Sequence, residues 1–196
     1  MIEMRSALLK DAAAIAQIHV SCWQDVYPFM PKEVHAARGY EFRLEQWTRT
    51  LEEQDPNQQI LVIEDDGEII GFTMVKENDD PAMPDARGEL HAAYFLPRYR
   101  GHAIGIHALN RMIHFLWSRD LWPVCLWAFR DNPVREKYEK AGWTPVVHRD
   151  RDVAGVMIPE VGYTLSNEMA EIYLYMNDRL EDEADDTRLA PPPQNR

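Results

Sequence analysis

The segment from Arg100 to Gly105 reads Arg-Gly-His-Ala-Ile-Gly and could bind an anion. The apolar run Leu90 to Leu96 precedes it and predicts a buried strand, and apolar residues then recur at helical spacing at Ile106, Leu109, Ile113 and Leu116. The first amides of a helix lack partners and lie at the positive end of its dipole, and glycine allows close approach. A phosphate is therefore the favoured ligand. The same pattern also fits an ordinary connection between a strand and a helix.

Length and composition are those of a globular chain. The 196 residues suit one domain with a sizeable core, and 45% of them are hydrophobic. No apolar run approaches the roughly 20 residues of a membrane helix, and the first residues lack the pattern of a signal peptide. Cys22 and Cys125 give neither a disulfide framework nor a metal cluster, and the histidines show no metal-binding spacing. We expect a cytoplasmic protein with no metal site and no membrane partner.

The formal net charge of −12 bears on the class of partner. Nucleic-acid binding relies on Lys and Arg side chains that neutralise phosphates, so an acidic chain is a poor match for nucleic acid. The charge favours a cationic small molecule or a basic peptide, although a solvated acidic surface is the simpler explanation. We expect no nucleic-acid partner.

The apolar patterns predict a mixed α/β order. Strands are expected at Met4–Leu8, Leu90–Leu96, Trp122–Phe129, Trp143–Arg149 and Val156–Leu165, with a hairpin at Ile60–Glu64 and Glu68–Lys76. Pro159 indicates an edge or a bulge in the last of these strands. The acidic segment 77–88 contains two prolines, and we expect an exposed loop there.

Three further helices are predicted besides the one after Gly105. The first is capped by Asp11 and carries Ile15, Ile18 and Cys22 on one face, and the second carries Tyr40, Leu44, Trp47 and Leu51. The third begins at Asn132-Pro133, an N-cap followed by proline, and ends at Ala141-Gly142.

The end of the chain gives a divided signal. Met169, Ile172, Tyr173, Met176 and Leu180 have helical spacing, whereas Ile172, Leu174 and Met176 also alternate as in a strand. We favour a helix that covers apolar surface and could form a homodimer contact. Residues 183–196 are acidic and rich in proline, which predicts a disordered tail. The expected organisation is one domain over 1–182, with an extension from about 166, followed by this tail.

Several motifs follow one another in a specific order. The strand Ala93-Tyr94-Phe95 leads into residues 98–105, and about thirty residues later come Leu126 to Pro133 and then Tyr138 to Trp143. Ile158 to Tyr163 forms a last motif, and Ile18 to Trp23, followed by Tyr27, forms an early one. Together, over about Met1 to Leu165, they resemble a bacterial branch of the GCN5-related N-acetyltransferase (GNAT) superfamily.

The resemblance implies a fold and a co-substrate. The fold is α/β, a central twisted mixed sheet of six to seven strands flanked by about four helices, here with a C-terminal extension. The co-substrate is acetyl-CoA, whose pyrophosphate is held by backbone amides. The residues implied in binding it are Ala93, Tyr94, Phe95, Arg100, Gly101, His102, Ala103, Ile104, Gly105, Ile106 and Asn132.

The chain departs from the family pattern in three places. Ala103 stands where most members have the first glycine of the motif, which predicts a looser phosphate contact. Only six positions separate Asn132 from Tyr138, where seven are common, so either the loop is shorter or Asp131 takes the place of the asparagine. The chain also continues beyond the usual last strand.

The resemblance also implies catalytic roles. GNAT enzymes transfer the acetyl group directly to an amine, without an acyl-enzyme, and neither cysteine has a recognisable histidine partner. Tyr138 matches the general acid, because a phenol is protonated at neutral pH and can donate to the leaving sulfur. Glu89 matches the general base. His91 lies on the same strand face and is the reserve candidate, and a water chain is a third route. Each residue also has an alternative that involves no catalysis. Tyr138 could be an aromatic side chain packed in the core, and Glu89 could be a solvated carboxylate at the end of a strand.

Trp23 and Tyr27 are candidates for the border of the acceptor site, with core packing as the alternative. The leading function is an acetyl-CoA-dependent N-acetyltransferase acting on a small amine or on a peptide or protein amino group. A toxin-type enzyme that acetylates aminoacyl-tRNA is disfavoured by the acidic charge. A regulatory module that binds acyl-CoA without catalysis is the alternative from a different class.

Overall fold

The structure is a computed structural model that describes residues 2–53, 55–101 and 104–175, and all structural statements below concern these residues. Its elements are β1 (Ile2–Ser6), η1 (Leu9–Asp11), α1 (Ala12–Val26), α2 (Lys32–Ala37), α3 (Tyr40–Glu52), β2 (Gln59–Asp65), β3 (Glu68–Glu77), β4 (Gly88–Phe95), η2 (Pro97–Tyr99), α4 (Ile104–Ser118), β5 (Val124–Phe129), α5 (Arg135–Lys140), β6 (Trp143–Val153) and β7 (Val156–Leu165). A last helix covers 167–175.

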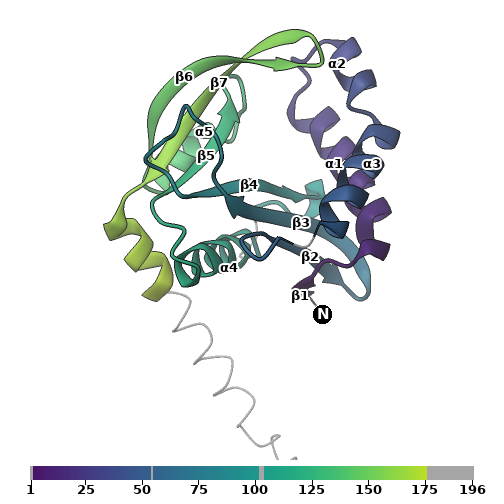
Figure 1. Cartoon of the computed structure of the whole chain (residues 1–196). Coiled ribbons are helices and arrows are strands. Elements are labelled where there is room, and N and C mark those ends of the chain that lie inside the picture. Colours follow the sequence, from purple (N-terminus) through teal and green to yellow (C-terminus); the bar gives the residue numbers. More distant parts are fainter. Residues whose placement is uncertain (1, 54, 102–103, 176–196) are drawn as a thin grey trace, which may run out of the picture.

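One seven-stranded mixed sheet organises the chain, with the strand order β1-β2-β3-β4-β5-β7-β6. Neighbouring strands are antiparallel except for β4 and β5, which run parallel. The helices lie on the sheet's two faces and around its ends (Figure 1). The expectation of a mixed α/β fold with six to seven strands is confirmed.

The helices cover the two faces of the sheet separately. Ile15, Ile18 and Cys22 of α1 pack with Trp47 of α3 against buried side chains of β2 and β3. On the opposite face, α4 packs against β3, β4, β5 and β7, and Figure 1 shows α4 on the other side of the sheet from α1 and α3. Apolar residues at helical spacing are buried in this way because each helix has one face on the sheet and one in water.

The strands β4 and β5 separate soon after they meet. They pair only at Gly88↔Val124 and Glu89↔Cys125. The register between β3 and β4 changes at the same level, because Met74 pairs with Ala92 and Val75 pairs with Leu90, which leaves His91 as an extra residue. Such a bulge bends its strand. The sheet therefore opens between β4 and β5 beyond Glu89.

A long hairpin, β6–β7, extends past the end of β5 and arches toward α2 (Figure 1). Val153 and Ile158 of this hairpin pack with Met30 and Val34 at α2. Pro159 immediately precedes Glu160, which is the first residue of β7 that pairs with β5. β7 as a whole is not an edge strand, because it lies between β5 and β6. The strand is edge-like only at Pro159, which pairs with β6 and not with β5.

The last helix, over 167–175, packs against the domain. Ala170 and Tyr173 are buried, and the Tyr173 hydroxyl donates to the Ala141 carbonyl at 3.1 Å. The Met169 side chain lies against Gly142, which has a φ of +89°. The predicted helix is confirmed as far as residue 175, and residues 176–182 and the tail 183–196 lie outside the described residues.

Several local predictions need correction. Asp11 stands at the predicted N-cap position of α1, but its side chain makes no capping hydrogen bond, because its carboxylate accepts from the Leu8 amide at 2.8 Å and binds Arg5. Ile106 is 49% exposed, so the buried face of α4 runs through Ile104, Ala108, Met112, Ile113 and Leu116. The short helix α2 was not predicted.

The loop 78–87 is only partly exposed, contrary to prediction. Met83 and Ala86 are buried in it, because its backbone folds back onto itself and the Asn78 amide donates to the carbonyls of both residues.

Candidate active site

A cleft of about 220 Å³ lies where the sheet opens, and we refer to it as the β4–β5 cleft. Its walls come from β4, β5, α4 and the segment that contains α5; they include Tyr94, Gly105, Met112, Asn132 and Tyr138. Residues 90–95 line it along β4, so the separated strand offers unpaired backbone groups to a ligand. The structure brings together Ala93, Tyr94, Phe95, Gly105, Asn132 and Tyr138 of the predicted residues.

The glycine turn reaches this cleft at the start of α4. Gly101 has a φ of +81°, a conformation that favours glycine, and a side chain added at Gly105 would meet nothing within 4 Å. The first amides of α4 therefore lie beside open space, as an anion site requires. His102 and Ala103, which the sequence also implicates in cofactor binding, lie outside the described residues.

Arg100 anchors the turn to the rest of the chain. Its Nε donates to the Phe95 carbonyl at 2.8 Å, Nη1 pairs with Asp25, and Nη2 contacts Cys22 Sγ at 3.5 Å. Its side chain is thus engaged by protein groups, so its contribution to a ligand would be to position the turn. Ile106 points toward solvent.

Tyr138 extends from α5 to the wall of the cleft. The centres of the Tyr138 and Tyr163 rings lie 6.0 Å apart. The Tyr138 hydroxyl makes no hydrogen bond to any described residue. Burial, together with the neighbouring hydroxyls of Tyr94 and Tyr163, raises the pKa of Tyr138 to about 12. The phenol therefore keeps its proton at neutral pH and is available as a donor.

Asn132, and not Asp131, faces the cleft. Asn132 is buried, its Oδ1 accepts from the Val134 amide at 2.9 Å and its Nδ2 donates to the Tyr27 hydroxyl at 3.5 Å. Asp131 is exposed and contacts Arg130. The shorter connection to Tyr138 therefore keeps the asparagine at the cleft.

A second cavity, of about 190 Å³, adjoins the cleft, and we refer to it as the α1–α3 cavity. Its lining comes from α1, α3, β4, β5 and the β6–β7 hairpin. Tyr27, His91, Tyr94 and Trp127 line both spaces. A molecule in the cavity would therefore lie next to one in the cleft, with these side chains at the boundary.

Glu89 and His91 form a pair at this boundary. His91 Nδ1 lies 2.8 Å from Glu89 Oε1, and Lys76 Nζ lies 3.5 Å from Glu89 Oε2. Burial alone would raise the pKa of Glu89, but the hydrogen bond to His91 and the charges of His91 and Lys76 outweigh it and lower the pKa. A carboxylate can only accept, so Nδ1 of His91 carries the proton of this hydrogen bond, and in the neutral form of the ring Nε2 has a free lone pair. Glu89 lines the α1–α3 cavity only, whereas His91 reaches both spaces.

Trp23 and Tyr27 lie where the sequence expected the acceptor border. Their rings meet edge to face at 5.5 Å, and Trp23 Nε1 donates to the Tyr94 hydroxyl at 3.0 Å. Both side chains are buried, and both line the α1–α3 cavity. The predicted packing role and a place at the cavity therefore coexist.

Neither cysteine is suited to form an acyl-enzyme. Cys22 and Cys125 are buried and free. Burial raises the pKa of both thiols, that of Cys125 to about 12. The reactive thiolate form is therefore disfavoured at neutral pH. Among the described residues, no group of three or more His, Cys, Asp and Glu side chains is arranged to hold a metal ion.

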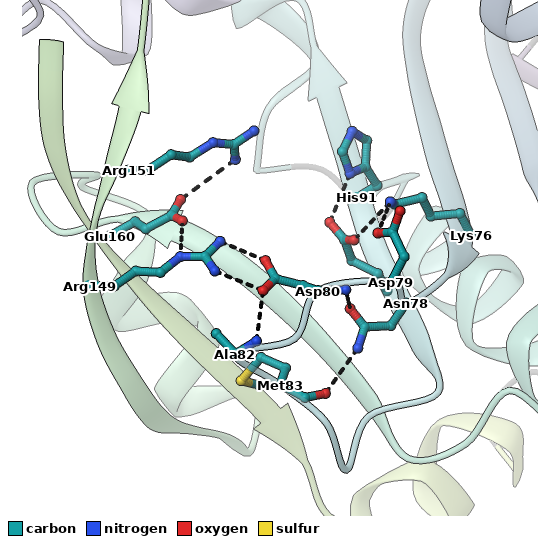
Figure 2. Close-up of polar contacts among 11 residues, drawn as sticks. Lys76, Asn78, Asp79, Asp80, Ala82, Met83, His91, Arg149, Arg151 and Glu160 are labelled. Carbon is teal, nitrogen blue, oxygen red and sulfur yellow. Dashed lines mark hydrogen bonds and ion pairs between the residues drawn. The ribbon is translucent and has the colours of Figure 1, made fainter. Parts of the chain in front are cut away.

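A charged network holds one wall of the α1–α3 cavity in place. Arg149 binds both carboxylate oxygens of Asp80, at 2.8 and 2.6 Å, and its Nε donates to Glu160 at 2.7 Å (Figure 2). Its guanidinium also lies 3.7 Å from the centre of the Trp127 ring. This network ties the loop 78–87 to the β6–β7 hairpin and fixes Trp127 at the boundary.

Sequence reasoning missed the charged lining of this cavity. Arg38 and Arg43 come from the α2–α3 region and Arg151 comes from the hairpin, and none of these three belongs to a motif. Glu160, also from the hairpin, lies within the motif Ile158 to Tyr163, but the sequence assigned no role to it. One signal was present for Arg43, because it stands four residues before the buried Trp47 and so shares its face of α3.

The comparisons agree with this geometry. The sequence profile described as the acetyltransferase (GNAT) family matches residues 12–143, more than half of the chain. The chain therefore belongs to the GNAT family of acetyltransferases, and the resemblance drawn from its motifs is confirmed. No helix of the described residues is long and apolar enough to cross a membrane.

Similar proteins fit the same family. The uncharacterized N-acetyltransferase YuaI of Bacillus subtilis (strain 168) is 26% identical over 168 residues, which cover 83% of this chain and 91% of YuaI. The PaiA N-acetyltransferase of Thermoplasma acidophilum, solved in complex with coenzyme A, has a TM-score of 0.61 at 22% identity and covers 82% of this chain and 98% of its own. YncA of Salmonella typhimurium, solved with its cofactor acetyl-CoA, has a TM-score of 0.57 at 17% identity. The match covers 85% of this chain and 94% of the YncA chain.

Proposed function

We propose that this acetyltransferase moves the acetyl group of acetyl-CoA directly to a primary amine, within a ternary complex. Acetyl-CoA would occupy the β4–β5 cleft, with its pyrophosphate at the start of α4 and its thioester near Tyr138. The amine would occupy the α1–α3 cavity. The observation that carries the proposal is that these two spaces adjoin and share His91, Tyr94 and Trp127 in their walls.

The chemistry needs a neutral amine, because a protonated nitrogen has no lone pair for attack. An aliphatic amine is mostly protonated at neutral pH, so a base must accept its proton. We assign this step to Nε2 of His91, oriented by the Glu89 carboxylate at Nδ1. Glu89 thus becomes a positioning residue in the proposal, and its lowered pKa fits that role because a carboxylate that holds its charge tightly is a weak base.

In the transfer, the amine nitrogen attacks the carbonyl carbon, the new C–N bond forms and the C–S bond breaks. The attacking nitrogen then releases a further proton to water, and the products are an N-acetyl amide and the coenzyme A thiolate, which takes up a proton from water. Tyr138 would donate to the sulfur as charge develops on it. Because the pKa of Tyr138 is about 12, well above the roughly 8.5 of an ordinary thiol, we expect stabilisation by a hydrogen bond more than complete proton transfer.

The test combines binding and turnover on the intact chain. Calorimetry with acetyl-CoA would measure cofactor binding, and thiol release with a panel of small amines and peptides would measure transfer. Intersecting initial-rate plots are expected for a ternary complex, whereas a ping-pong pattern would contradict direct transfer. Tight binding of acetyl-CoA with no thiol release from any amine would favour the regulatory module instead.

A further inference from the structure

Arg43 is a buried cation in the wall of the α1–α3 cavity. Its side chain extends from α3, it is 5% exposed, and its guanidinium lies 4.4 Å from the centre of the Trp23 ring. Nη1 donates to Gln46 Oε1 at 2.8 Å, but Nε and Nη2 are buried without a partner among the described residues. Burial lowers the pKa of Arg43 to about 10, so the group stays charged at neutral pH.

A second buried donor lines the same cavity. Nε1 of Trp127 is buried and has no acceptor in the described part of the chain. A buried donor that makes no hydrogen bond is destabilising, more so when the group is charged, so native structures rarely contain one without a partner. Here three donor nitrogens without a partner, Nε and Nη2 of Arg43 and Nε1 of Trp127, belong to residues that line one cavity.

The acids of the cavity do not satisfy these donors. Glu89 is paired with His91 and Lys76, and Glu160 is paired with Arg149 and Arg151.

Two further charged residues complete the lining. Asp152 Oδ1 accepts from the Gly155 amide at 2.7 Å. Arg38 stacks on Phe42 at 4.2 Å and has no carboxylate partner among the described residues. Arg38 and Arg43 thus lack a carboxylate partner and Asp152 lacks a cationic partner among the described residues, so the uncompensated charge of the cavity is positive, although the whole chain is strongly acidic.

The chemistry and the size of the cavity restrict its occupant. The planar fork of an arginine matches the two oxygens of a carboxylate and binds them through two parallel hydrogen bonds. An engineered cavity of about 150 Å³ holds a benzene molecule, so a cavity of about 190 Å³ takes a molecule only slightly larger.

We propose that the acceptor is a small amine that also carries a carboxylate, of amino-acid size, and that Arg43 binds the carboxylate. The proposal rests on the transferase function proposed above and names its substrate class. The amine would point toward the shared boundary at His91 and the carboxylate toward α3. Removal of water from Arg43 by Trp23 and Phe42 strengthens its attraction for an anion.

The experiment compares amino acids with their amides, in which a neutral group replaces the carboxylate. Leucine and phenylalanine would be assayed beside leucinamide and phenylalaninamide, with thiol release from acetyl-CoA as the readout. The intact enzyme is expected to favour the acids in kcat/KM by at least about 30-fold, because truncating one partner of a buried charge pair has an effect of this size. Equal rates with the acids and the amides would overturn the proposal without any variant.

Arg43→Gln tests the assigned residue. It should raise KM for the acids by a similar factor, with kcat and acetyl-CoA affinity nearly kept, and Arg43→Lys should recover part of the loss. Arg49→Gln is the matched control, because Arg49 is an exposed arginine on the same helix. An Arg43→Gln protein that binds acetyl-CoA normally and still prefers the acids would contradict the role of Arg43. Absence of transfer to every acceptor, with acetyl-CoA bound, would instead refute the transferase function itself.

Discussion

The β4–β5 cleft and the α1–α3 cavity adjoin, yet they are built differently. The cleft is lined mainly by apolar side chains and by the exposed edge of one strand, and much of it comes from a continuous stretch of chain. The cavity is lined by charged and aromatic side chains from α1, α3, β4, β5 and the hairpin. Backbone groups can bind a ligand that is the same in every reaction, and such binding depends little on the identity of the side chains. Selection of an acceptor, in contrast, depends on side chains.

Burial acts in both spaces with opposite results. It raises the pKa of Tyr138 in the cleft and lowers that of Arg43 in the cavity, because in each case it disfavours the charged form. Tyr138 thereby keeps a proton that it can donate, and Arg43 keeps a charge that is poorly compensated. The cleft is thus suited to a leaving group that becomes anionic, and the cavity is suited to an anion that is already present.

Tyr138→Phe should have the largest effect and should affect the cleft alone. The change keeps the ring and its packing but removes the hydroxyl that would donate to the sulfur. Turnover should fall by about 10²–10⁴-fold with little change in acetyl-CoA affinity, because the interaction grows only in the transition state. Steady-state kinetics and calorimetry would measure the two quantities.

Tyr173→Phe is the control for this variant. Its hydroxyl also belongs to the core beneath the cleft but binds the Ala141 carbonyl. Its loss should reduce stability by about 1 kcal/mol and leave turnover intact. Turnover of Tyr138→Phe within twofold of the parent would remove Tyr138 from the mechanism.

The raised pKa of Tyr138 also predicts how turnover should depend on pH. The donor must be protonated, so its contribution is present below its pKa and is lost as the pH rises through about 12. Turnover should therefore show no tyrosine-dependent decrease near pH 10, where an ordinary tyrosine ionises. A decrease near pH 10 that disappears in Tyr138→Phe would contradict the high pKa.

Gly105→Glu should separate cofactor binding from acceptor binding. The new carboxylate would stand beside the first turn of α4, where the pyrophosphate is expected. Two like charges about 4 Å apart at an effective dielectric of 20 repel by roughly 4 kcal/mol, so acetyl-CoA affinity should fall by roughly 10³-fold. Gly105→Gln has similar bulk without charge and should lose much less. Equal affinity for both variants, measured by calorimetry on folded protein, would contradict this placement.

Asp80→Asn should have the smallest effect and should affect the cavity alone. It breaks the paired hydrogen bonds to Arg149 that support Trp127 and should lower the free energy of unfolding at pH 7 by about 2 kcal/mol. KM for the acceptor should rise, whereas acetyl-CoA affinity should not change. Asp79→Asn is the control, because the Asp79 side chain is 83% exposed and only contacts Lys76. Equal losses of stability in both variants would show that the network does not support the wall.

The difference in the free energy of unfolding between the unmodified protein and Asp80→Asn should become smaller at low pH. The hydrogen bond from Arg149 lowers the pKa of Asp80 in the folded state. Its contribution is therefore present above the ordinary value of about 3.9 and is lost as the pH falls through the folded pKa. Denaturant titrations should show the difference between parent and Asp80→Asn shrinking below about pH 4.

Local sequence determined most of the elements and the residues of the proposed cofactor site. The spacing of apolar residues was enough to predict α1, α3 and α4, and the last strand was predicted with its observed bounds, because periodicity reports which face is buried. Gly105, Asn132 and Tyr138 could be placed because they belong to short motifs within or next to single elements. Ile106 was misplaced because periodicity alone does not fix which neighbouring positions of a helix face the sheet.

Only the tertiary structure decided the α1–α3 cavity, where we propose that the acceptor binds. Arg43, Trp127 and Glu160 are far apart in the chain and meet because the hairpin arches toward α2, while α3 packs against α1. The bulge at His91 is likewise a property of strand pairing, and it opens the sheet between β4 and β5. The net charge of −12 favoured a cationic partner, but the unpaired charge in the cavity is positive. A summed charge carries no information on which groups are buried together, and burial determines how strongly each one attracts a ligand.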